Sequence, residues 1–275
     1  MKPHLWVSLM TLSLGGAAQA QLAFNGSLSK ITFDASVLGV GVGPFLGGGF
    51  SPVPAAGQLD SDAWSVVAGG AAGEFVVFGG TTGSGTALGR GGAGGGVVTG
   101  GVWAFDVDPT ATVDRALGVQ PNDTLFTPGY ITLRIQNKTG DTLTSLTVGY
   151  DVYLRNDQAT ASSFGFSYSQ NDTAYTPVPS LNLTSPAAAD AAPAWTLTSR
   201  GPYAITSLNV HPDGFVYLRW TGNDASGIGA RDEFALDNVA LTPESRTLAL
   251  LTGLGLWGFA CARRLNPAVS AAPSR

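Results

Sequence analysis

The sequence predicts an all-β fold, an antiparallel β-sandwich of the jelly-roll kind. Segments in which apolar and polar residues alternate recur along the second half of the chain, and clusters of Gly, Pro, Asn and Asp separate them roughly every 8 to 14 residues. Between the two ends of the chain, no stretch of ten or more residues has the 3.6-residue apolar repeat of a helix. Many short strands without a helical layer bury their apolar sides by packing one sheet on another.

Individual strands follow from the same alternation. Every second side chain in residues 130–136 is apolar, and residues 143–154 place Leu146, Val148, Tyr150, Val152 and Leu154 on one face. Both patterns are typical of half-buried antiparallel strands. A continuous apolar segment bounded by glycines predicts a buried strand at residues 74–78. Further strands are expected at 22–33, 163–169, 181–183, 195–197, 205–210, 214–220 and 234–241.

Two glycine-rich tracts, 39–49 and 79–101, interrupt the first part of the domain. Their composition predicts flexible surface loops that contribute nothing to a hydrophobic core. Gly94 and Gly96 begin the spacing of a dinucleotide-binding G-x-G-x-x-G motif, but Thr99 stands where the third glycine is needed. Strand-forming residues follow, so no helix N-terminus is available to bind a phosphate.

The first 20 residues have the features of a secretory signal peptide. Lys2 precedes an apolar core at residues 5–14, and Ala18-Gln19-Ala20 has the small-x-small pattern that signal peptidase accepts. We therefore expect an exported protein that begins at Gln21. The following residues, 21–241, have an ordinary length for a single β-sandwich domain.

Residues 242–264 have the organisation of a membrane-sorting segment. A Pro243-Glu244-Ser245 break precedes an apolar run in which residues 247–262 carry no charge, and the pair Arg263 and Arg264 follows it. This run predicts a C-terminal apolar helix, slightly shorter than the roughly 17–25 residues that comfortably span a bilayer. The arginines would hold its C-terminal end on the cytoplasmic side of the membrane. Residues 265–275 are expected to form a disordered tail.

This order of motif, apolar helix and arginine pair resembles the PEP-CTERM sorting signal of Gram-negative bacteria, with Ser245 in place of the second proline. The resemblance implies processing by an exosortase, a membrane-embedded enzyme. It also implies an intermediate in the inner membrane, followed by delivery to the cell surface or to the extracellular matrix of a biofilm. Five further segments resemble exported bacterial β-sandwich proteins with such tails, which implies the fold but no activity. They are residues 114–118, 137–146, 163–169, 218–220 and 234–239.

The composition excludes some partners and crosslinks. The chain has 19 Asp and Glu against 14 Lys and Arg, a net charge of −5. An acidic domain repels nucleic-acid phosphates and anionic lipids, so nucleic acid is not an expected partner. The single cysteine, Cys261, forbids an intramolecular disulfide. We expect it to be a small apolar residue of the C-terminal helix, with a lipid attachment point as the alternative.

Candidates for catalysis are few. His211, the one histidine outside the signal peptide, precedes Pro-Asp-Gly and is expected in a β-turn. Neither an H-E-x-x-H zinc motif nor a G-x-S-x-G serine motif is present. Glycoside hydrolases need two carboxylates at a defined separation. The carboxylates available for this role are Asp106 with Asp108, Asp232 with Glu233, and Asp237.

Two binding hypotheses remain. Calcium binds carboxylate, amide and backbone oxygens, and acidic residues gather in and beside the loop at 222–229. The predicted calcium ligands are Asp106, Asn223, Asp224, Asp232 and Asp237, although acidic turns need no metal. Carbohydrate stacks on aromatic faces, and the alternation in residues 214–220 turns Tyr217 and Arg219 to the polar side of their strand and Trp220 to the core.

We therefore expect a non-catalytic protein of the cell surface or matrix that binds polysaccharide or other matrix proteins, with calcium as the one candidate cofactor. The alternative is an extracellular glycan hydrolase that uses one of the carboxylate pairs. A pocket with two carboxylates backed by aromatic subsites would favour the hydrolase.

Overall fold

The computed structural model describes residues 21–27, 29–69, 73–108 and 113–243. Strands dominate these residues, which contain a single helical turn, the 3-10 helix η1 (Pro179–Leu181). None of the described residues forms a helix of the length and apolarity that crossing a membrane requires. The expected signal peptide, the apolar C-terminal segment with Cys261 and the tail at 265–275 lie outside the described residues.

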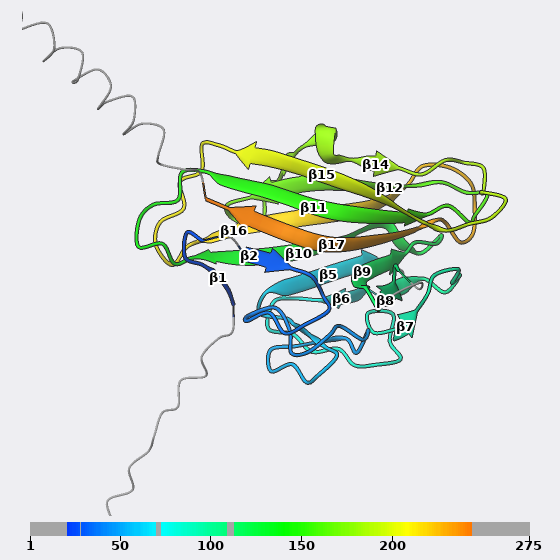
Figure 1. The fold of residues 1–275 in the computed structure, drawn as a ribbon, viewed down its shortest axis with the longest axis horizontal. Helices are drawn as coiled ribbons and strands as arrows, with labels where there is room; N and C mark the ends of the chain where they lie inside the picture. Colours follow the sequence, from blue (N-terminus) through cyan, green and yellow to red (C-terminus); the bar gives the residue numbers. More distant parts are fainter. Residues whose placement is uncertain (1–20, 28, 70–72, 109–112, 244–275) are drawn as a thin grey trace, which may run out of the picture.

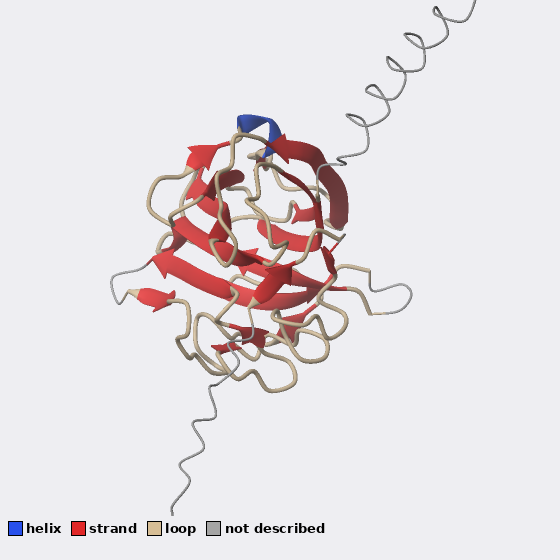
Figure 2. Cartoon of the chain, turned by 90° about the vertical axis from the view of Figure 1, so that its left-hand side faces the viewer, coloured by secondary structure: helices blue, strands red, loops and turns tan. Residues whose placement is uncertain are grey.

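Two large sheets form the body of the molecule (Figures 1 and 2). Sheet A has the spatial order β13 (Thr176–Pro177), β12 (Ser162–Ser169), β16 (Phe215–Asp224), β10 (Leu125–Asn137), β5 (Trp64–Gly69) and β6 (Glu74–Val76), with β1 (Leu22–Phe24) beside β10 and β14 (Leu183–Thr184) beside β12. Sheet B has the order β15 (Trp195–Ile205), β11 (Leu146–Arg155), β17 (Glu233–Thr242), β9 (Arg115–Gln120), β8 (Gly101–Asp106) and β7 (Gly92–Ala93), with β2 (Ser29–Ile31) beside β17.

Successive long strands alternate between the two sheets. From β10 onward the chain passes to β11 in sheet B, β12 in sheet A, β15 in sheet B, β16 in sheet A and β17 in sheet B. The pairs formed by these strands with one another are antiparallel. The predicted all-β antiparallel sandwich is therefore confirmed.

Aromatic side chains fill the space between the sheets. Trp220 of sheet A is fully buried, and its ring meets Tyr150 of sheet B edge-on with the centroids 5.5 Å apart. Phe164 of sheet A stacks on Phe234 of sheet B at 5.3 Å. These residues lie on the faces that the alternation predicted to be apolar, and β11 follows that alternation along most of its length. The core forms because both sheets direct every second side chain inward.

The predicted strand at 22–33 is wrong in one respect. The segment forms two short strands in different sheets: β1 pairs with β10 of sheet A, and β2 pairs with β17 of sheet B. Gly26 lies between them with φ +83°, a conformation that favours glycine. The segment therefore closes one side of the sandwich by joining the two layers.

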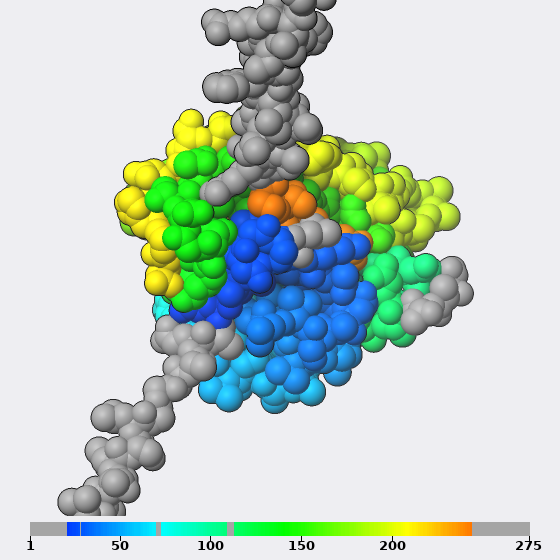
Figure 3. All heavy atoms as spheres, turned by 60° about the vertical axis from the view of Figure 1, so that its left-hand side comes forward, coloured from blue at the N-terminus to red at the C-terminus, as the bar shows by residue number. Residues whose placement is uncertain are grey.

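The glycine tracts differ from the sequence prediction. Phe45 and Leu88, one from each tract, are buried and belong to the main core. The backbones of the tracts also meet directly, because a Cβ built on Gly47 would lie 2.3 Å from the carbonyl oxygen of Gly91. With β3 (Phe50–Ser51) and β4 (Leu59–Asp60) they form a packed layer below the sheets in Figure 1. In Figure 3 the first tract, with β3 and β4, is part of the blue surface.

Candidate functional site

The outer face of sheet A carries arginines and aromatic rings. In the register of β10 and β16, Arg134 lies opposite Tyr217 and Thr132 lies opposite Arg219. Tyr130 extends the β10 row by one further outward position. The arrangement confirms the predicted orientation of Tyr217 and Arg219, since the alternate residues of β16, Trp220 among them, are buried. We call the following set the arginine–aromatic face: Phe78, Tyr130, Arg134, Tyr175, Phe215, Tyr217 and Arg219.

Arg219 is held between two tyrosine rings. Its guanidinium carbon lies 3.8 Å from the ring centroid of Tyr130 and 3.6 Å from that of Tyr175. The guanidinium also donates to the Thr132 hydroxyl at 3.0 Å and to the Asp172 carboxylate at 3.2 Å. The Tyr175 hydroxyl donates to the same carboxylate. Arg219 thereby links β16 and β10 to the loop before β13, and its charge is paired with that of Asp172.

Arg134, on the same face, is likewise held by aromatic rings. Its guanidinium carbon lies 4.4 Å from the ring centroid of Phe78 and 4.9 Å from that of Phe215. Its Nε and Nη2 atoms donate to the backbone oxygen of Asp62, at 2.9 and 2.6 Å. The Tyr217 ring lies 6.0 Å from Phe78 and 6.2 Å from Phe215, so three aromatic rings surround this arginine.

The chemistry of this face suits stacking and hydrogen bonding. Tyr217, Phe215 and Tyr130 are half-buried, and partial burial raises the pKa of Tyr217 above its usual value, so its hydroxyl stays a neutral donor at physiological pH. On the neighbouring strand β12, Gly165 and Ser167 lie opposite Thr221 and Arg219 and add small, polar surface. Rings held rigidly beside hydroxyl and N–H donors could contact both the apolar and the polar faces of a ligand.

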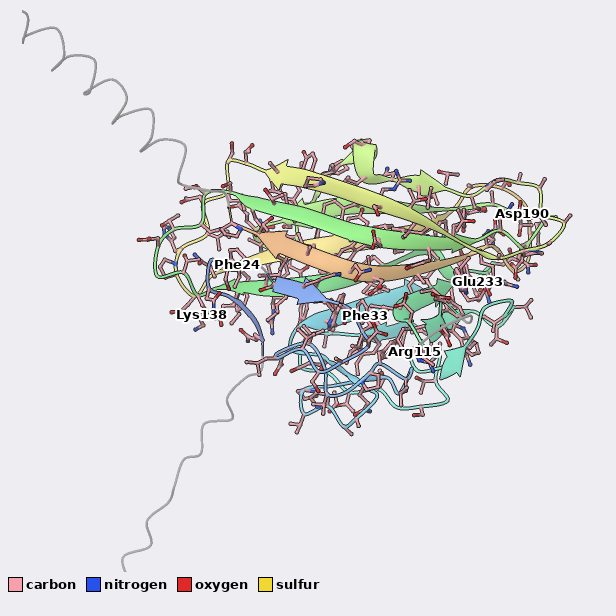
Figure 4. The ribbon with its side chains drawn as sticks, in the orientation of Figure 1. Phe24, Phe33, Arg115, Lys138, Asp190 and Glu233 are labelled. Carbon is pink, nitrogen blue, oxygen red and sulfur yellow. The ribbon has the colours of Figure 1, made fainter. Side chains whose placement is uncertain are left out.

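Glu233, one of the carboxylates available to the hydrolase alternative, is completely buried near one end of sheet B. It is labelled at the right of Figure 4, at the opposite end from Phe24 and Lys138. Its Oε1 accepts a hydrogen bond from the backbone N–H of Val97 at 2.7 Å, and its Oε2 lies 3.9 Å from Nε of Arg155. Burial, supported by the charge of Asp157, raises the pKa of Glu233 to about 8. The carboxyl group fastens a glycine-rich loop to the sandwich.

Of the other candidate carboxylates, Asp232 has its own partners, whereas Asp106, Asp108 and Asp237 lie close enough to Asp114 to interact with its charge. Asp232, also fully buried, accepts from the backbone N–H of Gln158 at 2.9 Å, and burial raises its pKa. Asp106 accepts from the backbone N–H of Asp114 at 3.2 Å. Asp237 lies further along β17, where burial raises its pKa to about 8 with help from the charge of Asp114. Asp108 follows β8, after the strand has ended.

The five predicted calcium ligands are not brought together. Asp224, the last residue of β16, pairs with Arg231 at 3.1 Å, and Asn223 precedes it. Asp232 lies directly before β17 and Asp237 within it, five residues or about 16 Å apart in an extended chain, whereas calcium ligands lie about 2.3–2.6 Å from the ion. In the ranges that the structure describes, no group of three or more His, Cys, Asp and Glu side chains is arranged to hold a metal ion.

His211 lies at an exposed turn, as predicted. Its carbonyl oxygen accepts from the N–H of Gly214 at 2.9 Å, and its Nδ1 lies 3.3 Å from the Thr142 hydroxyl. Of the sorting motif, Pro243 ends the described part of the chain directly after β17, and Glu244, Ser245, Arg263 and Arg264 lie outside the described residues.

Sequence reasoning found two of the seven residues of the arginine–aromatic face. Tyr130 and Arg134 could have been added from the alternation in residues 130–136, which places them on the polar side of that strand. Phe78 and Tyr175 gave no such signal, because both lie outside regular strands. The positions of these two residues depend on the path of the loops, which the alternation of apolar and polar residues in strands does not predict.

No protein-family model matches the sequence, and no curated protein is similar to it. Among solved structures, the chain is similar to the K1 cleaved adhesin domain of Lys-gingipain from Porphyromonas gingivalis W83, with a TM-score of 0.40 and 11% identity, covering 80% of this chain and 100% of that one. It is similar to the K2 adhesin domain of Lys-gingipain, with a TM-score of 0.38 and 14% identity over 78% and 97% of the two chains. It is also similar to TmCBM61 in complex with β-1,4-galactotriose, with a TM-score of 0.30 and 9% identity, covering 50% of this chain and 76% of that one. Similarities this low identify neither a family nor a function.

Proposed function

We propose that this chain is a non-catalytic polysaccharide-binding protein and that the arginine–aromatic face is its binding surface. The observation that carries the proposal is the convergence of five rings and two arginines, from separate segments, on the outer side of one sheet. Both guanidinium groups are fixed by stacking and hydrogen bonds, so the face is pre-organised. A sugar ring can stack its C–H face on such aromatic rings while its hydroxyl groups bond to their polar neighbours.

We further propose that the sandwich is a jelly roll. The order β10, β16, β12, β13 in sheet A and β9, β17, β11, β15 in sheet B supports this topology, because two interlocking Greek keys generate such an order. The jelly roll leaves the outer face of sheet A free of any covering helix among the described residues. The binding surface is thus a product of the fold.

The binding proposal is tested by removing two rings. We expect the double variant Phe215→Ala/Tyr217→Ala to lose most binding to the polysaccharides that the native chain retains in a glycan array and in affinity electrophoresis. Leu197→Ala is the control, because Leu197 is an accessible apolar residue, 50% exposed, on β15 of the other sheet. Unchanged binding by the double variant, or a native chain that retains no glycan, would refute the proposal.

We also propose that the protein acts outside the cell. The signal-peptide features of residues 1–20 and the PEP-CTERM-like segment at 242–264 support export, an inner-membrane intermediate and processing by an exosortase. Intact mass should show a chain that begins at Gln21, at the cell surface or in the matrix. Replacing Pro243 and Glu244 by alanine should leave full-length protein in the inner membrane. Identical fractionation of native and altered proteins would instead indicate a plain membrane anchor.

A glycan hydrolase is the second candidate function. Glu233 favours it, because a carboxyl group with a pKa of about 8 stays protonated at neutral pH, as a general acid must be. Its complete burial opposes it, since a substrate would first have to displace the loop that contains Val97. Release of reducing sugar by the native chain, abolished in Glu233→Gln, would establish the hydrolase and displace the binding protein as the main function.

A further inference from the structure

The two arginines of the arginine–aromatic face differ in charge balance. Arg219 forms an ion pair with Asp172 at 3.2 Å. Arg134 has no carboxylate within salt-bridge distance among the described residues, and its bonds go to a neutral backbone carbonyl. The charge of Arg219 is therefore balanced by Asp172, whereas Arg134 keeps a net positive charge.

Arg134 also keeps unused donors. A guanidinium group has five N–H bonds, and the Asp62 carbonyl takes one from Nε and one from Nη2. Among the described residues, its Nη1 atom has no hydrogen-bond partner and is not one of the buried unpartnered atoms, so it reaches solvent. A planar fork of N–H donors matches a carboxylate in geometry and in charge.

The surroundings of Arg134 strengthen its attraction for an anion. The rings of Phe78, Phe215 and Tyr217 replace part of its water shell and lower the local dielectric constant. The carboxyl groups of Asp60 and Asp62 are buried, and the charge of Arg134 acts on Asp60 without a direct ion pair. The charge of Arg134 is therefore not cancelled by an ion pair with a carboxylate of the described residues.

We propose that Arg134 is a subsite for a carboxylate group and that the polysaccharide bound by this face is a uronate polymer. This inference rests on the proposed function. A uronate residue could stack on Tyr217 or Phe215 and direct its carboxylate to the free edge of Arg134. Arg219 positions Tyr130 and Tyr175 and contributes no free charge. The face thus has a charged part around Arg134, which would bind the carboxylate, and a neutral part around Arg219.

The test compares acidic polymers with their own uncharged esters. The native chain is titrated with polygalacturonate and with alginate, and with the esterified form of each, at about 0.15 M salt, where the repulsion between the polymer and the net negative charge of the chain is largely screened. We expect at least one acidic polymer to bind about tenfold more tightly than its ester, the contribution of one hydrogen-bonded charge.

Two charge-removing variants locate the effect. Arg134→Gln should bind the acid and ester forms equally, whereas Lys30→Gln, an exposed residue on β2 of the other sheet, should keep the native preference. Arg134→Lys, which keeps the charge but loses the fork, should retain part of the preference and serves where Arg134→Gln fails to fold.

Two outcomes would overturn the inference. If both acidic polymers bind no better than their esters, the carboxylate subsite is wrong while polysaccharide binding stands. If Arg134→Gln keeps the native preference, the anion binds elsewhere. Failure of every polymer, charged or neutral, would instead refute the proposed function itself.

Discussion

The outer faces of the two sheets use similar residues in opposite ways. On sheet A, the rings around Arg134 are half-buried and its guanidinium group meets solvent. On sheet B, Phe105 is fully buried and packs with Trp103 and Trp195 in a second, smaller hydrophobic cluster. Val97 of the glycine-rich loop packs against that cluster. Aromatic residues are therefore half-buried beside arginines on one face, and on the other they form a buried cluster.

The glycines explain why the loop can approach sheet B so closely. A Cβ on Gly118 would lie 2.1 Å from the Phe105 ring, and a Cβ on Gly95 would lie 2.7 Å from Cδ of Arg155. Neither position has room for a side chain, so the loop and the ring settle directly on the strands. On sheet A, Phe78 and Tyr175, which lie outside the strands, stack on Arg134 and Arg219, and the guanidinium group of Arg134 still reaches solvent.

The largest predicted effect is a difference in stability between variants of the two faces. Phe105→Ala should lower the free energy of unfolding by about 3–5 kcal/mol, or roughly 10 °C in melting temperature, because it empties the centre of the second cluster. Phe215→Ala, which removes a half-buried ring, should cost about 1 kcal/mol and act mainly on binding. Thermal melts of both variants measure the difference. Equal losses would mean that sheet A's face is structural too.

These contrasts mark the limit of what the sequence could predict. Alternation identified β10, β11, β16 and β17 and turned Tyr217 and Trp220 to the correct sides, because each strand records its own two faces locally. It could not predict that Phe45 and Leu88 lie in the core, since glycine tracts pack by close backbone approach and leave no periodic pattern. The stacking of aromatic rings on Arg134 and Arg219 depends on the register between strands that are distant in sequence, so it could not be predicted either.

The carboxyl groups of sheet B predict a pH effect of intermediate size. Burial raises the pKa values of Glu233 and Asp237 to about 8 in the folded chain, whereas unfolding returns them to about 4. The folded state therefore holds protons that the unfolded state releases. The stability they contribute is complete below about pH 4 and is lost as the pH rises to about 8. We expect the melting temperature to fall between pH 5 and pH 8.

The matched variant for the pH effect is Glu233→Gln/Asp237→Asn. It should flatten the decline, because neutral amides have no proton to lose. A native chain that grows more stable from pH 5 to pH 8 would show that the buried carboxyl groups of sheet B are ionised after all.

A smaller effect should distinguish the two arginines of sheet A. Arg219→Lys keeps the charge beside Asp172 but loses the planar contact with Tyr130 and Tyr175, so it should lower the melting temperature by about 3 °C. Its preference for acidic over esterified polymer should persist, because Arg134 is intact. Loss of that preference would mean that Arg134 and Arg219 act together as one charged site.

The smallest effect is expected from calcium. Asp224 forms an ion pair with Arg231, and Asp232, directly before β17, lies too far along the extended chain from Asp237 to share an ion with it. Because a cation that binds only the folded state raises the melting temperature in proportion to the logarithm of its concentration, a change within about 1 °C on adding calcium or a chelator would indicate that turn geometry alone accounts for these acids. A rise of several degrees would show that calcium binds a smaller group of oxygen atoms, and the variant Asp237→Asn would then test whether the carboxylates of sheet B provide it.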